Sequence, residues 1–385
     1  MKKIITCIIL LFMCLPVFVR AEENNKDSLL DDGKSAILIE ASTGNVLYEK
    51  NSHERYAPAS MTKIMSMILI MEYIENNKMK WDDYLVASEH AASMGGSQIF
   101  LRPNEKMTVK DLFKAVSVGS ANDATVVFAE AIAGTEDNFV VMMNEKAKKL
   151  GLNDTNFKNA TGLDEANHYS SAHDMAMMAR ELIKHEKIFE FTTIYEDYLR
   201  QNTDNKFWLV NTNKLIKTYS GVDGLKTGYT TEAGYCLTAT IKKDNMRLIG
   251  TIMGASDGKT RNSNMIKLIN YGYNLYKVHT VIKKGDKVAQ KIVPKAENQK
   301  VNIVAKEDAN ILLKKQDTPN EYNYEMKLND LSIPLNKGDI IGKMILKDGN
   351  KKVLTINLTV DNDIKKANIF ELYKRTLKSI VTGSM

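Results

Sequence analysis

The chain has 385 residues, of which 44% are hydrophobic and 26% are charged. These proportions are typical of a globular protein with a large core, and they exclude a disordered or fibrous chain. The formal net charge of +6 is small for this length, and the body of the chain has no concentrated basic stripe of the kind that binds nucleic acid. We therefore expect no nucleic-acid partner.

Residues 1–21 have the pattern of a secretory signal. Two lysines precede an apolar run over 4–18, and Ala21 is a small residue suited to cleavage. The run is short for a membrane-spanning helix, although an uncleaved N-terminal anchor is the alternative. We expect an exported protein that begins with a flexible polar segment at 22–33.

Cysteine usage fits this prediction. Cys7 and Cys14 lie inside the predicted signal, so the exported chain keeps Cys236 alone and has no internal disulfide. Cys236 lies in an apolar strand pattern, and we interpret it as a small buried hydrophobe rather than a nucleophile.

Between 34 and 278 the hydrophobic pattern switches between the strand period and the helix period. In chain order, two strands are followed by a series of helices, then by three strands and a final helix. Strands are predicted at 35–40, 45–50, 225–229, 235–242 and 247–253. Helices are predicted at 60–75, 109–118, 122–132, 135–150, 175–185 and 262–276.

The texture changes after this region. Residues 280–361 alternate apolar and polar in short runs punctuated by glycine turns, which predicts a small all-β domain. Residues 363–385 form a basic amphipathic helix pattern, with Phe370 and Leu377 on the apolar side and Lys374 opposite. Such a helix can lie in a membrane interface, and packing against its own domain is the alternative.

Chemistry is suggested first by Ser60-Met61-Thr62-Lys63 at the start of a predicted helix. Residues three apart share a helix face, so the Lys63 amine can meet the Ser60 hydroxyl. A serine becomes a good nucleophile only when a base takes its proton, and lysine is a base only when its pKa is lowered. The same pattern recurs at Ser256-Asp257-Gly258-Lys259, which we interpret as a turn without a helix directly after it.

Two further short motifs follow along the chain. Ser120-Ala121-Asn122 falls in a break between two helices, where Ser120 can relay a proton and Asn122 can hold Lys63. Both residues are also ordinary helix caps.

Lys226-Thr227-Gly228 lies on a predicted strand. Lys226 offers a positive charge and Thr227 a hydroxyl for a substrate carboxylate, and Lys226 would help to keep Lys63 neutral. Gly228 leaves room for an extended peptide beside the strand. The backbone N–H groups of Ser60 and Tyr229 could form an oxyanion hole.

Together, in this order and spacing, the three motifs resemble those of the low-molecular-mass penicillin-binding D-alanyl-D-alanine carboxypeptidases. The resemblance covers about residues 32–277 and extends to the sequence around His168. It implies an α/β (α+β) domain of the β-lactamase and transpeptidase type, in which a central antiparallel sheet is flanked by helices, at 34–278. The small β-rich domain and the closing helix also match the layout of that family.

The resemblance also implies roles. Ser60 would be acylated, Lys63 would be its base, Ser120 and Asn122 would complete the proton network, and Lys226 with Thr227 would bind the terminal carboxylate. The substrate would be a peptidoglycan pentapeptide ending in D-Ala-D-Ala at the extracytoplasmic face of the membrane or in the wall. β-Lactams would be inhibitors.

Several alternatives were weighed against this function. A class A β-lactamase would carry a Glu-x-x-x-Asn pattern between Ser120 and Lys226, and none is present. A non-catalytic penicillin sensor is disfavoured by the intact Ser60 and Lys63, whereas transpeptidation differs only in the acceptor. The six histidines have no zinc spacing and no phosphate-binding glycine loop occurs, so we expect neither metal nor cofactor.

Overall fold

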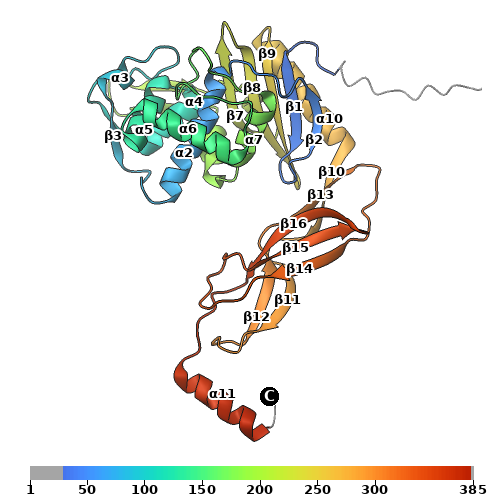
Figure 1. Cartoon of the computed structure of the whole chain (residues 1–385). Helices are drawn as coiled ribbons and strands as arrows, with labels where there is room; N and C mark the ends of the chain where they lie inside the picture. The colour runs from blue at the N-terminus through green and yellow to red at the C-terminus, as the bar shows by residue number, and fades with distance from the viewer. Residues whose placement is uncertain (1–28, 383–385) are drawn as a thin grey trace, which may run out of the picture.

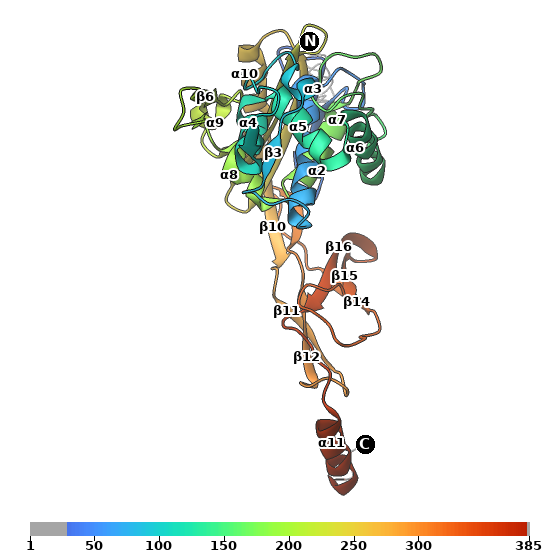
Figure 2. The same ribbon diagram turned by 90° about the vertical axis from the view of Figure 1, so that its left-hand side faces the viewer.

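The computed structural model of the chain describes residues 29–382, so the predicted signal at 1–21 lies outside the described residues. A large domain of helices and strands is followed by a β module and then by a helix that stands apart at the C-terminus (Figure 1). The view turned by 90° shows the same three parts in succession along one long axis (Figure 2).

The large domain is organised around a five-stranded antiparallel sheet of order β2-β1-β9-β8-β7. The strands are β1 (Ser35–Glu40), β2 (Val46–Lys50), β7 (Val222–Thr230), β8 (Gly234–Lys243) and β9 (Met246–Ala255). The order places β7, which carries the Lys-Thr-Gly motif, at an edge of the sheet. An edge strand leaves backbone donors and acceptors open to an incoming peptide.

Both faces of the sheet are covered, so β1 is buried along its whole length and β9 along nearly all of it, without alternation between buried and exposed residues. In β1, Ile37 and Ile39 belong to the core shared with the helical part of the domain, whereas Ala36 and Leu38 belong to a second core. Helix α10 packs on this second face, and α7 packs on the first (Figure 1). The Ser-x-x-Lys sequence at Ser60 lies on the side of the larger core, to which its neighbours Ala59 and Met61 belong.

Side-chain caps begin several helices of this domain, but the helices that start at Lys63 and Asn122 have none. Thr108 accepts from the Asp111 N–H at the start of α4, and Ser171 accepts from the Asp174 N–H at the start of α7. The helices are η2 (Ala59–Thr62), α2 (Lys63–Glu75), α3 (Glu89–Ala92), α4 (Val109–Gly119), α5 (Asn122–Ala133), α6 (Glu136–Leu150), α7 (Ala172–Leu182), η3 (Glu186–Ile188), α8 (Phe189–Thr192), α9 (Leu215–Thr218) and α10 (Gly258–Leu275).

Two short pairs of antiparallel strands complete the domain, and the sequence pattern did not predict them. They are β3 (Tyr84–Val86) with β4 (Lys106–Thr108), and β5 (Glu196–Leu199) with β6 (Phe207–Val210). Strands of three or four residues carry too little periodicity to be recognised.

The β module holds a five-stranded antiparallel sheet of order β11-β12-β16-β15-β14 and a separate β10–β13 pair. Its strands are β10 (Tyr276–Ile282), β11 (Lys287–Ile292), β12 (Lys300–Ala305), β13 (Ala309–Lys314), β14 (Asn323–Leu328), β15 (Gly342–Asp348) and β16 (Lys351–Val360). A separate apolar cluster, which includes Ile303, Met344 and Leu358, forms its core.

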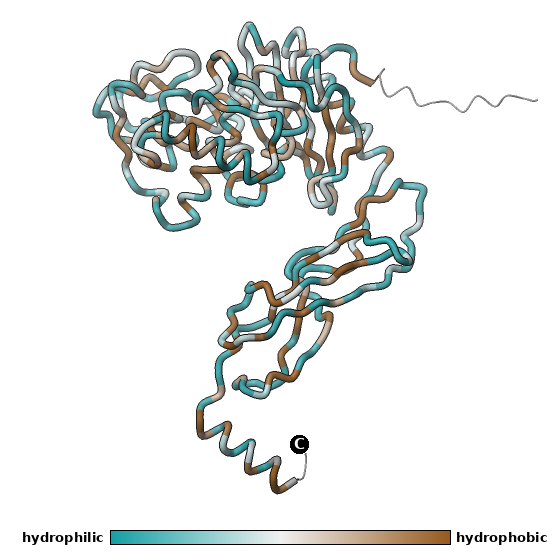
Figure 3. The backbone as a smooth tube through the Cα atoms, in the orientation of Figure 1, coloured by the Kyte–Doolittle hydropathy of each residue, from teal (hydrophilic) through white to brown (hydrophobic). Residues whose placement is uncertain are grey.

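The last helix, α11 (Ile369–Thr382), begins six residues after the predicted start at 363. Apolar and polar residues alternate along it in the hydropathy-coloured tube (Figure 3). Its contact with the β module includes Arg375, whose guanidinium donates to the carbonyls of Pro294, Ala296 and Glu297.

One sequence-based prediction is wrong at the start of α10. The segment Ser256–Lys259 was predicted to be a turn with no helix directly after it, yet α10 begins at Gly258. The Asp257 carboxylate caps the helix by accepting from the N–H groups of Lys259 and Thr260. The glycine at the first helical position hid this cap from the pattern.

Candidate active site

Ser60 lies in the 3₁₀ turn η2, which leads directly into α2. A 3₁₀ turn has three residues per turn, so Ser60 and Lys63 are eclipsed on one side of it. The Lys63 Nζ atom lies 3.1 Å from the Ser60 Oγ atom. The predicted α-helical start at Ser60 is therefore wrong in its geometry, but the pairing that was inferred from it is present.

The Lys63 amine has two further partners, and both can only accept hydrogen bonds. The Asn122 Oδ1 atom lies 2.6 Å from Nζ, and the Thr161 carbonyl oxygen lies 2.7 Å from it. A neutral amine has two protons and one lone pair. The two oxygens accept hydrogen bonds from these two protons. The lone pair is then left to accept a hydrogen bond from the Ser60 hydroxyl.

The surroundings favour this neutral amine. Lys63 is fully buried, and burial lowers its pKa well below the usual 10.5 because a charge loses its hydration there. The positive charge of Lys226 lowers the pKa further, whereas Asp123 and Glu136 oppose the shift.

Thr161 belongs to a loop that sequence reasoning did not include in the site. The loop presses against η2, because a Cβ atom added to Gly162 would lie 1.9 Å from the Ala59 carbonyl oxygen. Gly162 also has a φ of +87°, which a side chain would strain. The Asn159 Oδ1 atom accepts from the Gly162 N–H at 2.7 Å and so holds the loop in this shape.

His168 forms hydrogen bonds that link this loop to η2. One ring nitrogen, Nδ1, accepts from the Lys158 N–H at 3.1 Å, and the other, Nε2, lies 2.8 Å from the Thr62 Oγ1 atom. Burial lowers the pKa of His168 to about 4, so the ring is neutral at pH 7. A neutral ring whose Nδ1 accepts must carry its proton on Nε2, so it donates to Thr62.

The second motif lies where α4 ends. Ser120 has a left-handed φ of +63°, and its buried Oγ atom has no hydrogen-bond partner within the described part of the chain. An unpaired buried hydroxyl is costly and is therefore available to a ligand. Asn122 begins α5, and its amide Nδ2 donates to the Gly95 carbonyl at 2.7 Å, which fixes the orientation of Oδ1 toward Lys63.

The third motif lies on edge strand β7. Lys226 is fully buried, and its amine donates to the Thr227 carbonyl at 3.0 Å. Burial, aided by the positive charge of Arg261, lowers the pKa of Lys226 to about 7. The Thr227 hydroxyl donates to the Thr212 Oγ1 atom at 2.7 Å. Arg261 and Thr212 were not identified from the sequence.

The close packing of β7 on η2 is a second reason for a glycine at position 228, in addition to the predicted room for a peptide. A Cβ atom there would lie 2.8 Å from the Pro58 carbonyl oxygen, so the glycine allows β7 to lie close to η2. Next to it, the Tyr229 side chain is 56% exposed and packs on Tyr235, with ring centroids 4.3 Å apart.

The structure thus brings Ser60, Lys63 and Asn122 into direct contact and packs the β7 motif against η2. Cys236 is fully buried in the core, as predicted. By contrast, Ser256 and Lys259 of the second Ser-x-x-Lys sequence are exposed at the start of α10. Within residues 29–382, no group of three or more His, Cys, Asp or Glu could hold a metal ion.

A serine paired with a buried neutral lysine, beneath an antiparallel sheet edge, defines a serine hydrolase of the acyl-transfer class. Residues 22–257 match the Peptidase S11 family, D-alanyl-D-alanine carboxypeptidase, and residues 276–366 match the C-terminal domain of penicillin-binding protein 5. The chain belongs to this D-alanyl-D-alanine carboxypeptidase family.

Individual relatives agree with this assignment. The chain is 48% identical over 382 residues to D-alanyl-D-alanine carboxypeptidase DacF of Bacillus subtilis, covering 98% of both chains. Penicillin-binding protein 5 of Haemophilus influenzae superposes with a TM-score of 0.69 at 31% identity, covering 87% of this chain and 98% of that one. Penicillin-binding protein D2 of Listeria monocytogenes, in its ampicillin-bound form, gives 0.56 at 30% identity, with 63% and 97% covered.

Proposed function

We propose that this D-alanyl-D-alanine carboxypeptidase removes the terminal D-alanine of peptidoglycan stem pentapeptides through an acyl-enzyme on Ser60. The observation that carries the proposal is the position of the Lys63 amine, which lies 2.6 and 2.7 Å from two oxygens that can only accept hydrogen bonds and 3.1 Å from the Ser60 hydroxyl.

In the first step, Lys63 accepts the Ser60 proton and the Oγ atom attacks the carbonyl carbon of the penultimate D-alanine. The backbone N–H groups of Ser60 and Tyr229 hold the oxygen that becomes negative. The unpaired Ser120 hydroxyl passes the proton from Lys63 to the departing nitrogen. The C–N bond then breaks, and free D-alanine leaves.

Binding of the terminal carboxylate falls to the third motif. Lys226 and Arg261 supply positive charge, and Thr227 with Thr212 supplies hydroxyl donors. Because the free-enzyme pKa of Lys226 is about 7, a carboxylate beside it favours the charged amine.

In the second step, water attacks the ester, Lys63 accepts a proton from that water, and the Ser60 hydroxyl is restored. A β-lactam would acylate Ser60 in the same way, but its departing nitrogen stays tethered in the site. No glutamate was found at the position that drives the second step in class A β-lactamases, so we propose a wall enzyme rather than an antibiotic-degrading one.

Labelling with fluorescent penicillin beside an assay of D-alanine release from a defined pentapeptide tests this function. Both signals are expected from the wild-type chain. Labelling without release would support a penicillin sensor instead, and formation of a peptide bond to an added amine would support a transpeptidase.

For α11 we propose a position in the membrane interface. Its apolar side chains are exposed: Ile369 by 87%, Phe370 by 67% and Ile380 by 72%. Packing on the β module, which is the alternative, would have buried them. Within the described residues, no helix is long and apolar enough to cross a bilayer, so attachment here would be superficial.

Deletion of 364–385 tests the membrane proposal without touching Ser60. The truncated protein is expected to lose binding to vesicles of anionic phospholipid while retaining D-alanine release. The full-length double variant Phe370→Ser, Leu377→Ser is a second variant that keeps the basic residues, and it should also fail to bind. Vesicle binding that survives both changes would refute the proposal.

Export through residues 1–21 remains part of the same proposal. The similarity to a D-alanyl-D-alanine carboxypeptidase and to penicillin-binding protein 5 supports it, because the proposed peptidoglycan substrate lies outside the membrane. N-terminal sequencing of the exported protein should begin at Glu22, and a chain that still starts at Met1 would instead support the uncleaved anchor.

A further inference from the structure

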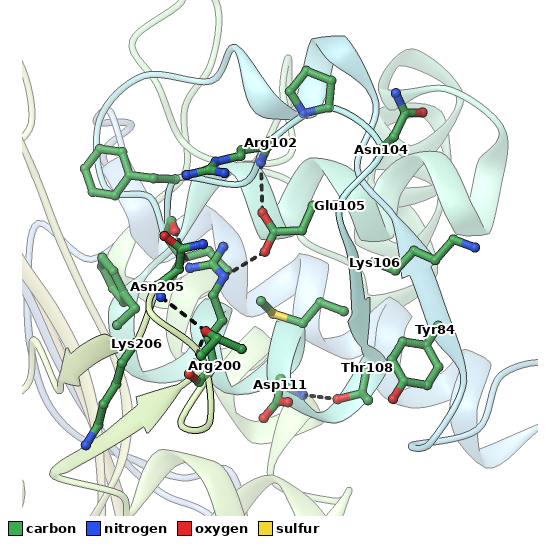
Figure 4. Close-up of a pocket in the computed structure, with 16 residues that line it drawn as sticks. Tyr84, Arg102, Asn104, Glu105, Lys106, Thr108, Asp111, Arg200, Asn205 and Lys206 are labelled. Carbon is green, nitrogen blue, oxygen red and sulfur yellow. Dashed lines mark hydrogen bonds and ion pairs between the residues drawn. The ribbon is translucent and has the colours of Figure 1, made fainter.

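A pocket of about 780 Å³ opens between the segment that leads into α4 and the β5–β6 hairpin (Figure 4). We name it the Arg200 pocket; Phe100, Arg102, Lys106, Arg200, Lys206 and Phe207 are among the residues that line it. None of Ser60, Lys63 or Lys226 lines this pocket, and the catalytic steps do not account for it.

The pocket contains a buried hydrogen-bond donor without an acceptor. Arg200 donates from Nε to the Glu105 carboxylate at 2.7 Å and from Nη1 to the Ile99 carbonyl at 3.0 Å. Its Nη2 atom is buried and has no partner in the described part of the chain. A buried guanidinium N–H left unpaired costs free energy, and an oxygen of a bound ligand would remove that cost.

The lining is also positively charged. It contains four cationic side chains and two carboxylates, Glu105 and Asp111. Glu105 is already paired with Arg200, and Asp111 lies 3.4 Å from the amine of Lys114, which is not part of the lining. Within residues 29–382, no carboxylate lies at ion-pair distance from the side chains of Arg102 or Lys106, so the pocket favours an anion.

The backbone around the pocket is held in an unusual conformation. Phe100, Asn104 and Arg200 have φ values of 56°, 65° and 52°, in the left-handed region that bulky side chains rarely adopt. Ala59 and Ser120, beside the catalytic serine and in the second motif, share this property. Strain of this kind persists where the surrounding structure imposes it, and it is concentrated at ligand sites.

Two short links connect the pocket to the catalytic centre. On one side, the Ile99 N–H donates to the carboxylate of Asp123, the neighbour of Asn122. On the other, the chain runs from Phe207 in the pocket through β6 to Thr212, which contacts Thr227. The five residue steps from Phe207 to Thr212 span at most about 17 Å, so one extended peptide can reach both places.

We propose that the Arg200 pocket binds a free carboxylate on the upstream half of the stem peptide, namely the α-carboxylate of its γ-linked glutamate. This inference rests on the proposed function, because it places the D-Ala-D-Ala end of the same peptide at Thr227. The pocket then selects stem peptides whose glutamate is not amidated.

Three substrates separate this contact from catalysis: a lysine-containing pentapeptide with the free glutamate carboxylate, the same peptide with that carboxylate amidated, and an N-acylated Lys-D-Ala-D-Ala tripeptide. The lysine at position three ensures that the glutamate carries the one internal carboxylate of the first peptide. D-Alanine release gives kcat/KM for each substrate.

The test variant is Arg102→Gln, Lys206→Gln, since both side chains are exposed and their loss leaves the Arg200–Glu105 pair intact. Lys110→Gln is the matched control, because Lys110 is an exposed cation at the start of α4 that does not line the pocket. The rate of penicillin labelling reports whether the Ser60 site is undisturbed.

The wild type should prefer the free carboxylate over the amidated peptide by about threefold to tenfold in kcat/KM. The double variant should lose this preference and keep its tripeptide and penicillin rates, whereas Lys110→Gln should retain it. Equal wild-type rates on the two pentapeptides, or equal losses by the double variant on all three substrates, would overturn the pocket assignment. Absence of D-alanine release from every substrate by the wild type would instead refute the proposed function.

Discussion

The chain carries two Ser-x-x-Lys sequences, and they differ in almost everything except the letters. Lys63 is fully buried and bonded to two carbonyl oxygens, with its Nζ atom 3.1 Å from Ser60. Ser256 and Lys259 are exposed, and Asp257 between them caps α10. The Ser-x-x-Lys sequence alone supplies a hydroxyl and an amine. Burial and fixed hydrogen-bond acceptors are needed to make that amine a base.

The largest expected effect is that of removing the Ser60 hydroxyl. Ser60→Ala should abolish penicillin labelling and lower kcat for D-alanine release by at least about 10⁴-fold, because no other group can form the ester. Ser256→Ala should leave both unchanged. Residual labelling of Ser60→Ala that disappears when Ser256 is also replaced would break the comparison.

Removal of the Lys63 amine should have the next largest effect. Lys63→Met is expected to lower the acylation rate by about 10²- to 10⁴-fold, the usual contribution of a general base. Lys259→Met should have no effect. Rapid-mixing measurement of acylation by a chromogenic β-lactam separates this step from hydrolysis, and a Lys63→Met rate near that of the wild type would show that another group takes the proton.

The pH dependence of kcat/KM provides a further test, because burial brings the titration of the Lys226 amine into the neutral range. The pKa of Lys226 in the free enzyme is about 7, so its charge is lost as the pH rises through that value. The kcat/KM for the pentapeptide should therefore fall above pH 7, by up to about tenfold per pH unit. At the low-pH end, protonation of Lys63 removes the base. Lys226→Arg, which stays charged, should flatten the alkaline limb, and an unchanged alkaline limb would contradict the assignment.

The smallest expected effect concerns stability. A buried lysine whose pKa is lowered binds fewer protons in the folded state than in the unfolded state, so folding is penalised near neutral pH and less so as the pH rises toward 10.5. Lys63→Met should raise the free energy of unfolding by about 1–2 kcal/mol at pH 7, and by less at pH 9.5. Lys259→Met should be neutral at both. Urea unfolding measures each value, and destabilisation by Lys63→Met at pH 7 would count against a buried, penalised amine.

The sequence predicted the regular elements well where periodicity was long. β1 was predicted at its observed bounds, and α4 and α5 each differed by one residue at the C-terminal end. The β3–β4 and β5–β6 strand pairs were missed because strands this short show no period. The predicted domain boundaries and the export signal stay predictions.

For the candidate site, the sequence predicted the side chains that lie in short motifs. It did not predict the partners that come from distant parts of the chain. Thr161 is 98 residues from Lys63 and contributes a backbone carbonyl, which every residue type possesses. Thr212 and Arg261 approach β7 from separate elements, so no local spacing pointed to them. The pH dependence of Lys226→Arg tests the role assigned to Lys226, and the roles of Ser120 and Tyr229 stay predictions.

The close contact between Gly162 and Ala59 limits how the enzyme can escape an antibiotic. Any side chain at position 162 would collide with the Ala59 carbonyl and push apart the loop that holds Thr161 and the turn that holds Ser60. A resistant variant arising at this position would lose its reaction with the wall peptide along with its reaction with the drug. Mutational routes to resistance must therefore leave this glycine in place.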